Sequence, residues 1–209
     1  AVASHDPATD AGRPRMTHAA LRIIHDEHAA LAVLLRTMGV LLAAYRKHGT
    51  SPDFALLRAM LFYVDEFPER LHHAKESALL FPRLRARAPE LGPVLDRLER
   101  DHARGGAAAR DLEHALLGFE LMGEARRIAF EQALDEFVSA SLEHMRVEET
   151  EVLPVAEKVL APEDWAALDA AFRENRDPLT GHAPEDDYRE LFSRIVRQVP
   201  APFGLGPAL

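Results

Sequence analysis

The sequence predicts an all-α protein: an antiparallel up-down four-helix bundle, followed by additional short C-terminal helices and an extended tail. Apolar residues recur at alternating steps of three and four along four long segments, which is the spacing of one face of an α-helix. The connections between these segments are short, so neighbouring helices are expected to run antiparallel. Segments with strand-like alternation are scarce.

Composition limits the class of protein. The 209 residues are 47% hydrophobic and 28% charged, which suffices for one domain with a core. The net charge of -9 argues against nucleic acid or an anionic membrane surface as the main partner. No apolar run is expected to approach a membrane span, and we expect residues 1–16 to be a flexible arm rather than a signal peptide. The chain has no cysteine, which excludes disulfides and thiolate chemistry and favours a cytoplasmic location.

The first two helices are predicted between residue 17 and Arg87. The sequence His48 to Pro52 ends the first helix, with Ser51 as the expected N-cap of the second helix and Pro52 at its first position. Pro68 lies inside the second helix and should kink or break it. The inward positions of the first helix are predicted to be Leu21, Ile24, His28, Leu31, Leu35, Met38, Leu42 and Tyr45.

The remaining helices follow the boundary at Ala88-Pro89-Glu90. The third helix is predicted to turn inward Leu91, Leu95, Leu98, His102, Gly105, Ala109, Leu112 and Leu116. The fourth is predicted to turn inward Leu134, Phe137, Ser141, His144, Glu148, Val152, Val155 and Val159. A short helix (163–174), a polar loop, an amphipathic helix (185–198) and the tail PAPFGLGPAL complete the chain. We therefore divide it into an arm (1–16), the bundle (17–160) and a C-terminal extension (161–209).

The bundle contains an internal repeat. Residues 72–82 read HHAKESALLFP and residues 144–154 read HMRVEETEVLP. Both have a His-x3-Glu motif, an apolar pair, and a proline ten residues after the histidine. Upstream, IHDEH ends at His28 and LERDH ends at His102, which lie at similar distances before the two motifs. The chain thus consists of two copies of one helix pair.

The repeat predicts a metal site. Residues four apart on a helix differ in direction by about 40°, so each His-x3-Glu motif presents both side chains on one face. Buried carboxylates are costly unless a positive charge meets them, and imidazole with carboxylate suits iron, manganese or zinc. Two carboxylates can bridge two cations while two histidines complete each, which leaves an open position for a ligand. The candidate metal ligands are His28, His72, Glu76, His102, His144 and Glu148.

The four motifs, IHDEH, HHAKESALLFP, RDH and HMRVEETEVLP, resemble those of the hemerythrin-like family, the HHE cation-binding domains, over roughly 17–160. The resemblance implies a non-haem di-iron centre in which two iron ions share an oxo or hydroxo bridge and the carboxylates of Glu76 and Glu148. Manganese or zinc are the expected substitutes. Oxygen-carrying hemerythrins of marine invertebrates have a second histidine on the third helix where this chain has Gly106, so a five-histidine site is not implied. Gly105-Gly106 is instead expected to leave space for a small ligand.

Two choices between neighbouring histidines remain open as alternatives. His72 is preferred to His73 because spacing four matches the second repeat and the residues around His73 look solvated. His28 is preferred to His25, which falls on the position of an acidic residue in the other copy. Three acids that precede site histidines could orient an imidazole but are expected to face solvent: Asp26, Glu27 and Asp101. The other histidines are expected at the surface: His5, His18, His48, His114 and His182.

The sequence therefore favours a protein that binds O2 or NO at a carboxylate-bridged di-iron centre, with no catalytic residue assigned. One alternative is a di-iron oxidoreductase acting on peroxide or O2, although no substrate pocket or electron source is evident in the sequence. A second is a module that senses iron, oxygen or NO, or serves a stress response through protein contacts. A metal-free bundle ranks last because it would bury two unpaired carboxylates. We expect a monomer or a homodimer; the sequence does not identify the physiological ligand or the electron donor.

Overall fold

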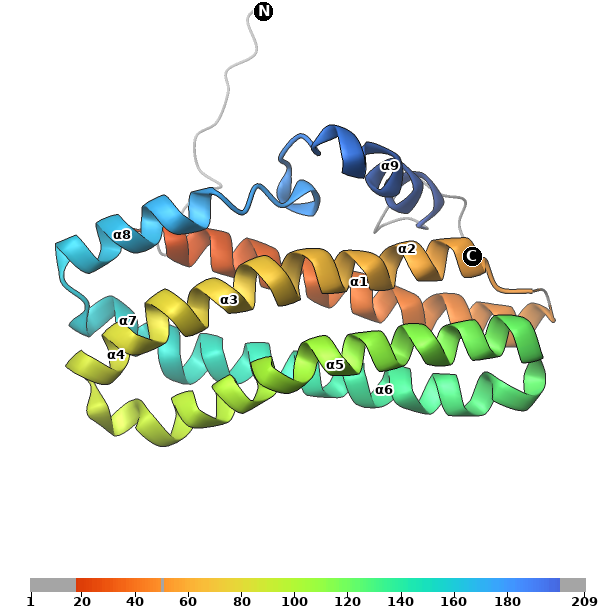
Figure 1. Cartoon of the computed structure of the whole chain (residues 1–209), viewed down its shortest axis with the longest axis horizontal. Coiled ribbons are helices and arrows are strands. Elements are labelled where there is room, and N and C mark those ends of the chain that lie inside the picture. The colour runs from red at the N-terminus through yellow and green to blue at the C-terminus, as the bar shows by residue number, and fades with distance from the viewer. Residues whose placement is uncertain (1–17, 50, 200–209) are drawn as a thin grey trace, which may run out of the picture.

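A computed structural model describes residues 18–49 and 51–199, and every regular element in these two ranges is helical (Figure 1). The all-α prediction is confirmed. The predicted arm (1–16) and the tail PAPFGLGPAL lie outside the described residues. The α-helices are α1 (Ala19–His48), α2 (Phe54–Val64), α3 (His73–Lys75), α4 (Phe81–Arg87), α5 (Gly92–Met122), α6 (Glu124–Val147), α7 (Leu153–Val159), α8 (Pro162–Arg173) and α9 (Arg189–Gln198).

Four long rods run side by side along the long axis of the molecule (Figure 1). They are α1, the continuous series α2–α3–α4, α5, and the series α6–α7. Inside the second and fourth rods the α-helices are joined by π-helical turns. The predicted four-helix bundle is thus confirmed, with α8 packed along α1 and α9 packed along α2.

The second rod begins later than predicted. Its N-cap is Asp53, whose side chain accepts a hydrogen bond from the Leu56 N–H at 2.9 Å. The assignment of Ser51 as the cap and Pro52 as the first helical residue is therefore wrong. Both positions carry good N-terminal residue types, but aspartate caps equally well and is the residue directly before Phe54.

Pro68 does not end the second rod, because the chain passes it as a π-helix, η1 (Asp65–His72). The His73 N–H donates to the Pro68 carbonyl five residues earlier, which is the wider π spacing. Proline lacks an N–H and its ring clashes with the carbonyl four residues before it. The wider turn removes this clash and keeps the rod continuous, so the predicted local break takes the form of a change in helix type.

The two His-x3-Glu motifs run into the same unusual turn. Each glutamate begins a short π-helix, η2 (Glu76–Leu80) in one copy and η4 (Glu148–Val152) in the other. In both, the residue five positions after the glutamate donates its N–H to the glutamate carbonyl. The donors are Phe81 and Leu153 respectively. A proline follows each of these donors. Because that proline has no N–H, it cannot continue the α-helical ladder, and the turn before it widens.

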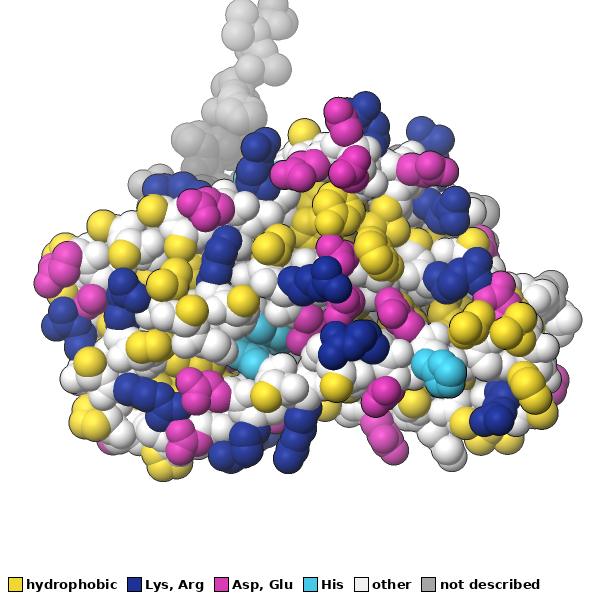
Figure 2. Space-filling view, in the orientation of Figure 1, with side chains coloured by type: hydrophobic (Ala, Val, Ile, Leu, Met, Phe, Trp, Pro, Cys, Tyr) yellow, Lys and Arg dark blue, Asp and Glu magenta, His cyan; other side chains and the backbone are white. Residues whose placement is uncertain are grey.

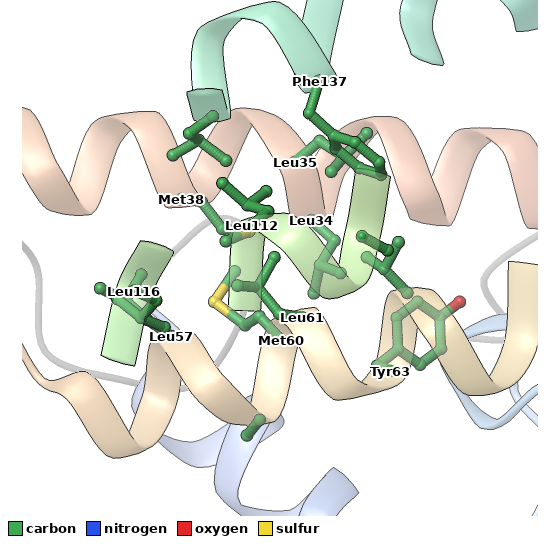
Figure 3. Packing of buried hydrophobic residues seen from close by; sticks show 14 of the residues in the cluster. Leu34, Leu35, Met38, Leu57, Met60, Leu61, Tyr63, Leu112, Leu116 and Phe137 are labelled. Carbon is green, nitrogen blue, oxygen red and sulfur yellow. The ribbon is translucent and has the colours of Figure 1, made fainter. Parts of the chain in front are cut away.

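Two hydrophobic clusters fill the bundle, one on either side of the site residues. The first lies between α1, α2, α5 and α6, where the labelled side chains point toward one another (Figure 3). The second lies between the start of α1, α4, the start of α5, α7 and α8. On α1, His28 falls between Ile24 of the second cluster and Leu31 of the first, and on α5, His102 falls between Leu98 and Ala109 in the same way.

One helix contradicts the expectation that no apolar run approaches a membrane span. An 18-residue window of α1 has a mean hydropathy of 1.6, so by length and composition it could cross a membrane. In this fold α1 is an element of the bundle, with Leu35 and Met38 fully buried against the other rods. The core helix of a bundle passes the same test of length and composition, so this feature is weak evidence for a membrane span.

Candidate metal centre

Histidines and glutamates gather between the two hydrophobic clusters in two overlapping groups. The first group consists of His28, His72, Glu76 and Glu148, whose donor atoms all lie within 4.8 Å of one another. These side chains come from α1, η1, η2 and η4. The two glutamates are fully buried and the two histidines nearly so.

The second group consists of His73, Glu76, His102 and His144, with donor atoms again within 4.8 Å of one another. The imidazoles of His73 and His102 stack with ring centroids 4.2 Å apart, and Phe81 covers the other face of His102 at 5.4 Å. Packing therefore holds these rings in fixed orientations.

Both glutamates reach both groups. Glu76 Oε1 lies 2.7 Å from His72 Nε2, while its Oε2 lies 3.4 Å from His102 Nε2. Glu148 Oε2 lies 3.5 Å from His28 Nε2 and 3.9 Å from His144 Nε2. The two carboxylates thus stand between two sets of imidazole nitrogens, which is the position of a bridging ligand.

The donor atoms fit metal ions better than they fit one another. Within the described residues, none of the four oxygens of Glu76 and Glu148 accepts a hydrogen bond, although all are buried. His28 Nε2 lies 3.1 Å from His72 Nε2, and His102 Nε2 lies 3.1 Å from His144 Nε2. Two nitrogens bound at right angles to one ion, each about 2.1 Å from it, would lie about 3.0 Å apart. Each pair therefore fits the spacing of two ligands on a single ion.

The outer nitrogens of the five imidazoles face polar side chains. An Nδ1–H that donates outward leaves the lone pair of Nε2 directed at the centre, and such partners also fix the ring. Four of the five imidazoles form a hydrogen bond through Nδ1. The Nδ1 of His144 lies too far from its polar neighbour to form one. The pairs are His28–Glu149 (3.0 Å), His72–Glu27 (2.6 Å), His73–Glu69 (3.3 Å), His102–Ser77 (2.8 Å) and His144–Asp101 (3.6 Å).

Protonation in the metal-free chain is uneven. Burial lowers the pKa of His144 to about 2, helped by the charges of neighbouring histidines, so this imidazole is neutral. Burial also lowers the pKa of His73. At His72 burial acts in the same direction, but the charge of Glu76 and the hydrogen bond to Glu27 outweigh it and raise the pKa well above its usual value.

The pKa values of the two glutamates are shifted in opposite directions. Burial raises the pKa of Glu148 well above its usual value, and the negative charge of Glu76 adds to the rise. For Glu76 burial is outweighed by the charge of His72 and by the nearby imidazole of His102, which leave the pKa well below its usual value. The two upward pKa shifts, at His72 and at Glu148, favour the protonated form in the chain without metal.

The expectation that the surroundings of His73 are solvated is wrong, and the open choice between His72 and His73 ends with both in the site. The side chain of His73 is only 12% exposed and belongs to the second group. Its partner Glu69 is 9% exposed and lies against α5 at Gly105, where a Cβ atom would come within 2.6 Å of both carboxylate oxygens. Gly105 thus makes room for Glu69, and both residues line a cavity next to the second group, so there is space at Gly105 as expected. The chain thus has a fifth imidazole at the site. It comes from His73 on the second rod and not from the position of Gly106 on α5.

The structure brings together all six residues singled out by the repeat, adds His73 from the two alternatives and leaves His25 out. His25 is outside both groups, one-third exposed, with Nδ1 3.4 Å from Glu149. Asp26 faces solvent and Asp101 is 37% exposed, as expected. Of the other histidines, His18 is half-buried and stacks on Trp165 at 4.1 Å. The other histidines that the structure describes are exposed, as expected: His48, His114 and His182.

Glu27, by contrast, is buried, and the C-terminal extension holds it. Asn175 Nδ2 donates to both carboxylate oxygens of Glu27 at 3.0 Å, and Lys75 donates to the Asn175 side-chain carbonyl. The expectation that Glu27 faces solvent is wrong: it orients His72 from the neighbouring rod. Asn175 follows α8, so the extension closes the His28/His72 side of the site, a role that no local sequence pattern indicates.

Comparison with protein families gives one match. The model of the hemerythrin HHE cation-binding domain matches residues 19–156, which include both groups and exclude the extension. Searches of curated proteins and of solved structures found no match. The matched segment covers about two-thirds of the chain and includes all four rods as far as α7. The chain belongs to the hemerythrin HHE cation-binding domain family.

Proposed function

We propose that this protein binds two iron ions, one at each group, and through them a small diatomic ligand, O2 or NO. The donor set supports iron, because imidazole and carboxylate without thiolate suit iron, manganese or zinc. The observation that carries the proposal is the pair of buried carboxylates, each lying between two sets of imidazoles with no hydrogen-bond donor of its own. When bound, a ferrous pair supplies electrons and an open coordination position for O2, or a position for NO.

The asymmetry of the two groups indicates where a diatomic ligand would bind. The first group has two imidazoles and the second has three, so the first leaves more of a metal ion's coordination free. Beside the first group is a space of about 10 Å³, lined among others by Leu31, Phe67 and Asn175. A space of this size is at the lower limit for one water-sized molecule, so only a very small ligand suits it.

The protein side chains would set the conditions in that space. Leu31 and Phe67 exclude bulk water, and Phe67 is 8% exposed beneath α9. Glu27 holds the outer nitrogen of His72 and is itself held by Asn175. The first group therefore lies against a small, largely apolar space, which favours a small neutral ligand over larger molecules.

The test is anaerobic reconstitution with Fe(II), followed by titration with NO and, in a parallel sample, exposure to O2, each monitored by absorbance. The proposal predicts a saturable change at one ligand per pair of iron ions. Zinc-loaded protein, which cannot supply electrons, should show no response to O2. An iron-loaded protein that responds to neither gas would overturn the diatomic ligand while leaving the metal site in place.

Two variants separate the site from the rest of the bundle. The double variant His144→Ala/Glu148→Ala removes both the histidine and the glutamate of the second His-x3-Glu motif. It should abolish stoichiometric iron binding. His114→Ala changes an exposed histidine of α5 outside both groups and should leave iron binding unchanged. Near-normal iron content in the double variant would remove the proposed site.

A further inference from the structure

The second group opens onto a cavity far larger than a diatomic ligand needs. Its volume is about 490 Å³, and it is bounded by α1, α2, η1, α3, α5 and α6. Histidine side chains are visible in a depression of the surface between α3 and α5, next to acidic side chains (Figure 2). Sites for small organic molecules usually have volumes of about 300–1,000 Å³. The cavity is therefore of the size that holds an organic molecule.

The cavity combines apolar walls with a polar inner end. Three imidazoles of the second group, from His73, His102 and His144, line it. Side chains of the first hydrophobic cluster form much of its wall: Leu31, Val64, Leu112, Phe137 and Met145. An organic ligand would bury its apolar part against these side chains and place a polar end next to the second group.

The charges around the cavity select among organic ligands. Two guanidinium groups line it, those of Arg97 and Arg104, and Arg97 already pairs with Glu143 at 3.3 Å. Five carboxylates line it: Glu69, Asp101, Asp111, Glu136 and Glu143. This excess of negative charge repels an anionic ligand. It does not repel a neutral ligand, and it attracts a cationic one.

Glu69 is the most enclosed of these carboxylates. Its side chain is 9% exposed and is pressed against Gly105, with one oxygen accepting the His73 Nδ1–H. It stands one helical turn before His73, at the inner end of the cavity. This carboxylate gives the cavity a buried hydrogen-bond acceptor, which favours a ligand that carries a donor group.

We propose that this cavity binds a mainly apolar organic molecule, neutral or positively charged, beside the second histidine group. The inference rests on the proposed metal site, since the three imidazoles that line the cavity are also metal ligands in that proposal. It adds a second binding compartment, which shares Leu31 and His73 with the small space next to His28 and His72. The protein would then hold a gas and an organic molecule at the same time, one at each metal.

The test uses the full chain loaded with zinc, which leaves probe fluorescence unquenched, and two naphthalene dyes. One is the neutral 6-propionyl-2-dimethylaminonaphthalene and the other is the anionic 8-anilinonaphthalene-1-sulfonate. The variant Ala140→Phe adds bulk at an exposed cavity-lining position of α6, and Ala129→Phe adds the same bulk at an exposed position of α6 outside the cavity. Zinc content is measured for every sample.

We expect saturable binding of one neutral dye per chain, about tenfold weaker in Ala140→Phe and unchanged in Ala129→Phe. The anionic dye should bind more weakly than the neutral dye. Equal dye binding by the two variants, or no saturable binding to the wild type, would overturn the cavity as a ligand site. Equal or tighter binding of the anionic dye would overturn the assigned ligand class. A chain that takes up no zinc would instead refute the metal site, whatever the dyes do.

Discussion

Replacing Glu148 by methionine should stabilise the metal-free protein and weaken its response to metal. Glu148 is fully buried, and neither of its carboxylate oxygens accepts a hydrogen bond within the described residues. Its pKa is raised well above the usual value by burial and by the charge of Glu76, so ionisation at neutral pH costs free energy. A side chain of similar volume without polar atoms removes this cost while it keeps the packing.

The size of the effect follows from the unpaired group. A buried polar group without a partner costs about 1–3 kcal/mol. For a domain of this size 1 kcal/mol shifts the melting temperature by about 2–4 °C, so Glu148→Met should melt roughly 2–12 °C above the wild type in chelator. The same change at the exposed Glu151, three residues along, should shift the free energy of unfolding by less than about 0.5 kcal/mol.

The assay is thermal unfolding followed by far-ultraviolet circular dichroism, in chelator and with added zinc. Metal bound only by the folded state raises the melting temperature of the wild type. The variant lacks one of the two shared carboxylates, so it should start higher and gain less. If Glu148→Met melts below the wild type in chelator, the carboxylate has a stabilising partner and the reasoning that assigns it to a metal is refuted.

Three further predictions test individual parts of the centre. His73→Ala should lower bound iron from two ions to one per chain, whereas His25→Ala, which changes a partly exposed ring outside both groups, should leave two; equal loss in both would remove His73 from the site. Gly105→Ala places a Cβ atom within 2.6 Å of a carboxylate and should weaken binding of the second ion in a titration, while the same change at Gly106 meets only a flexible arginine at 3.4 Å and should have little effect. Because the pKa of His72 is raised, metal must displace its proton, so calorimetric affinity should fall by about tenfold per pH unit below that pKa; a flat profile would contradict this assignment.

The fold could be predicted from the sequence because each rod carries its own periodic pattern and each boundary has a local signal. The repeat likewise identified one histidine and one glutamate per motif, because its spacing of four residues is a property of a single helix. The π-helical turns were not predicted, yet a proline ten residues after each histidine was the visible signal. Each proline stands six residues after the glutamate of its motif. Because it has no N–H, the turn that starts at that glutamate widens.

The rest of the site depends on contacts between rods. His72 and His73 differ by about 100° on their helix, and a single-helix pattern selects only one of them. The second rod lies between the two groups, so these neighbours enter different groups. Asn175 reaches Glu27 across 148 positions of sequence, a contact that depends on how α8 packs on α1 and that no local motif encodes.

The most direct test of the central claim is an iron count combined with Mössbauer and electron paramagnetic resonance spectra of the reconstituted, air-oxidised protein. If Glu76 and Glu148 are shared as the structure places them, the chain should hold two iron ions whose spins are coupled, and the diferric form should give no paramagnetic resonance signal. A single iron per chain, or two irons that give the signal of isolated ferric ions, would contradict a centre built on shared carboxylates.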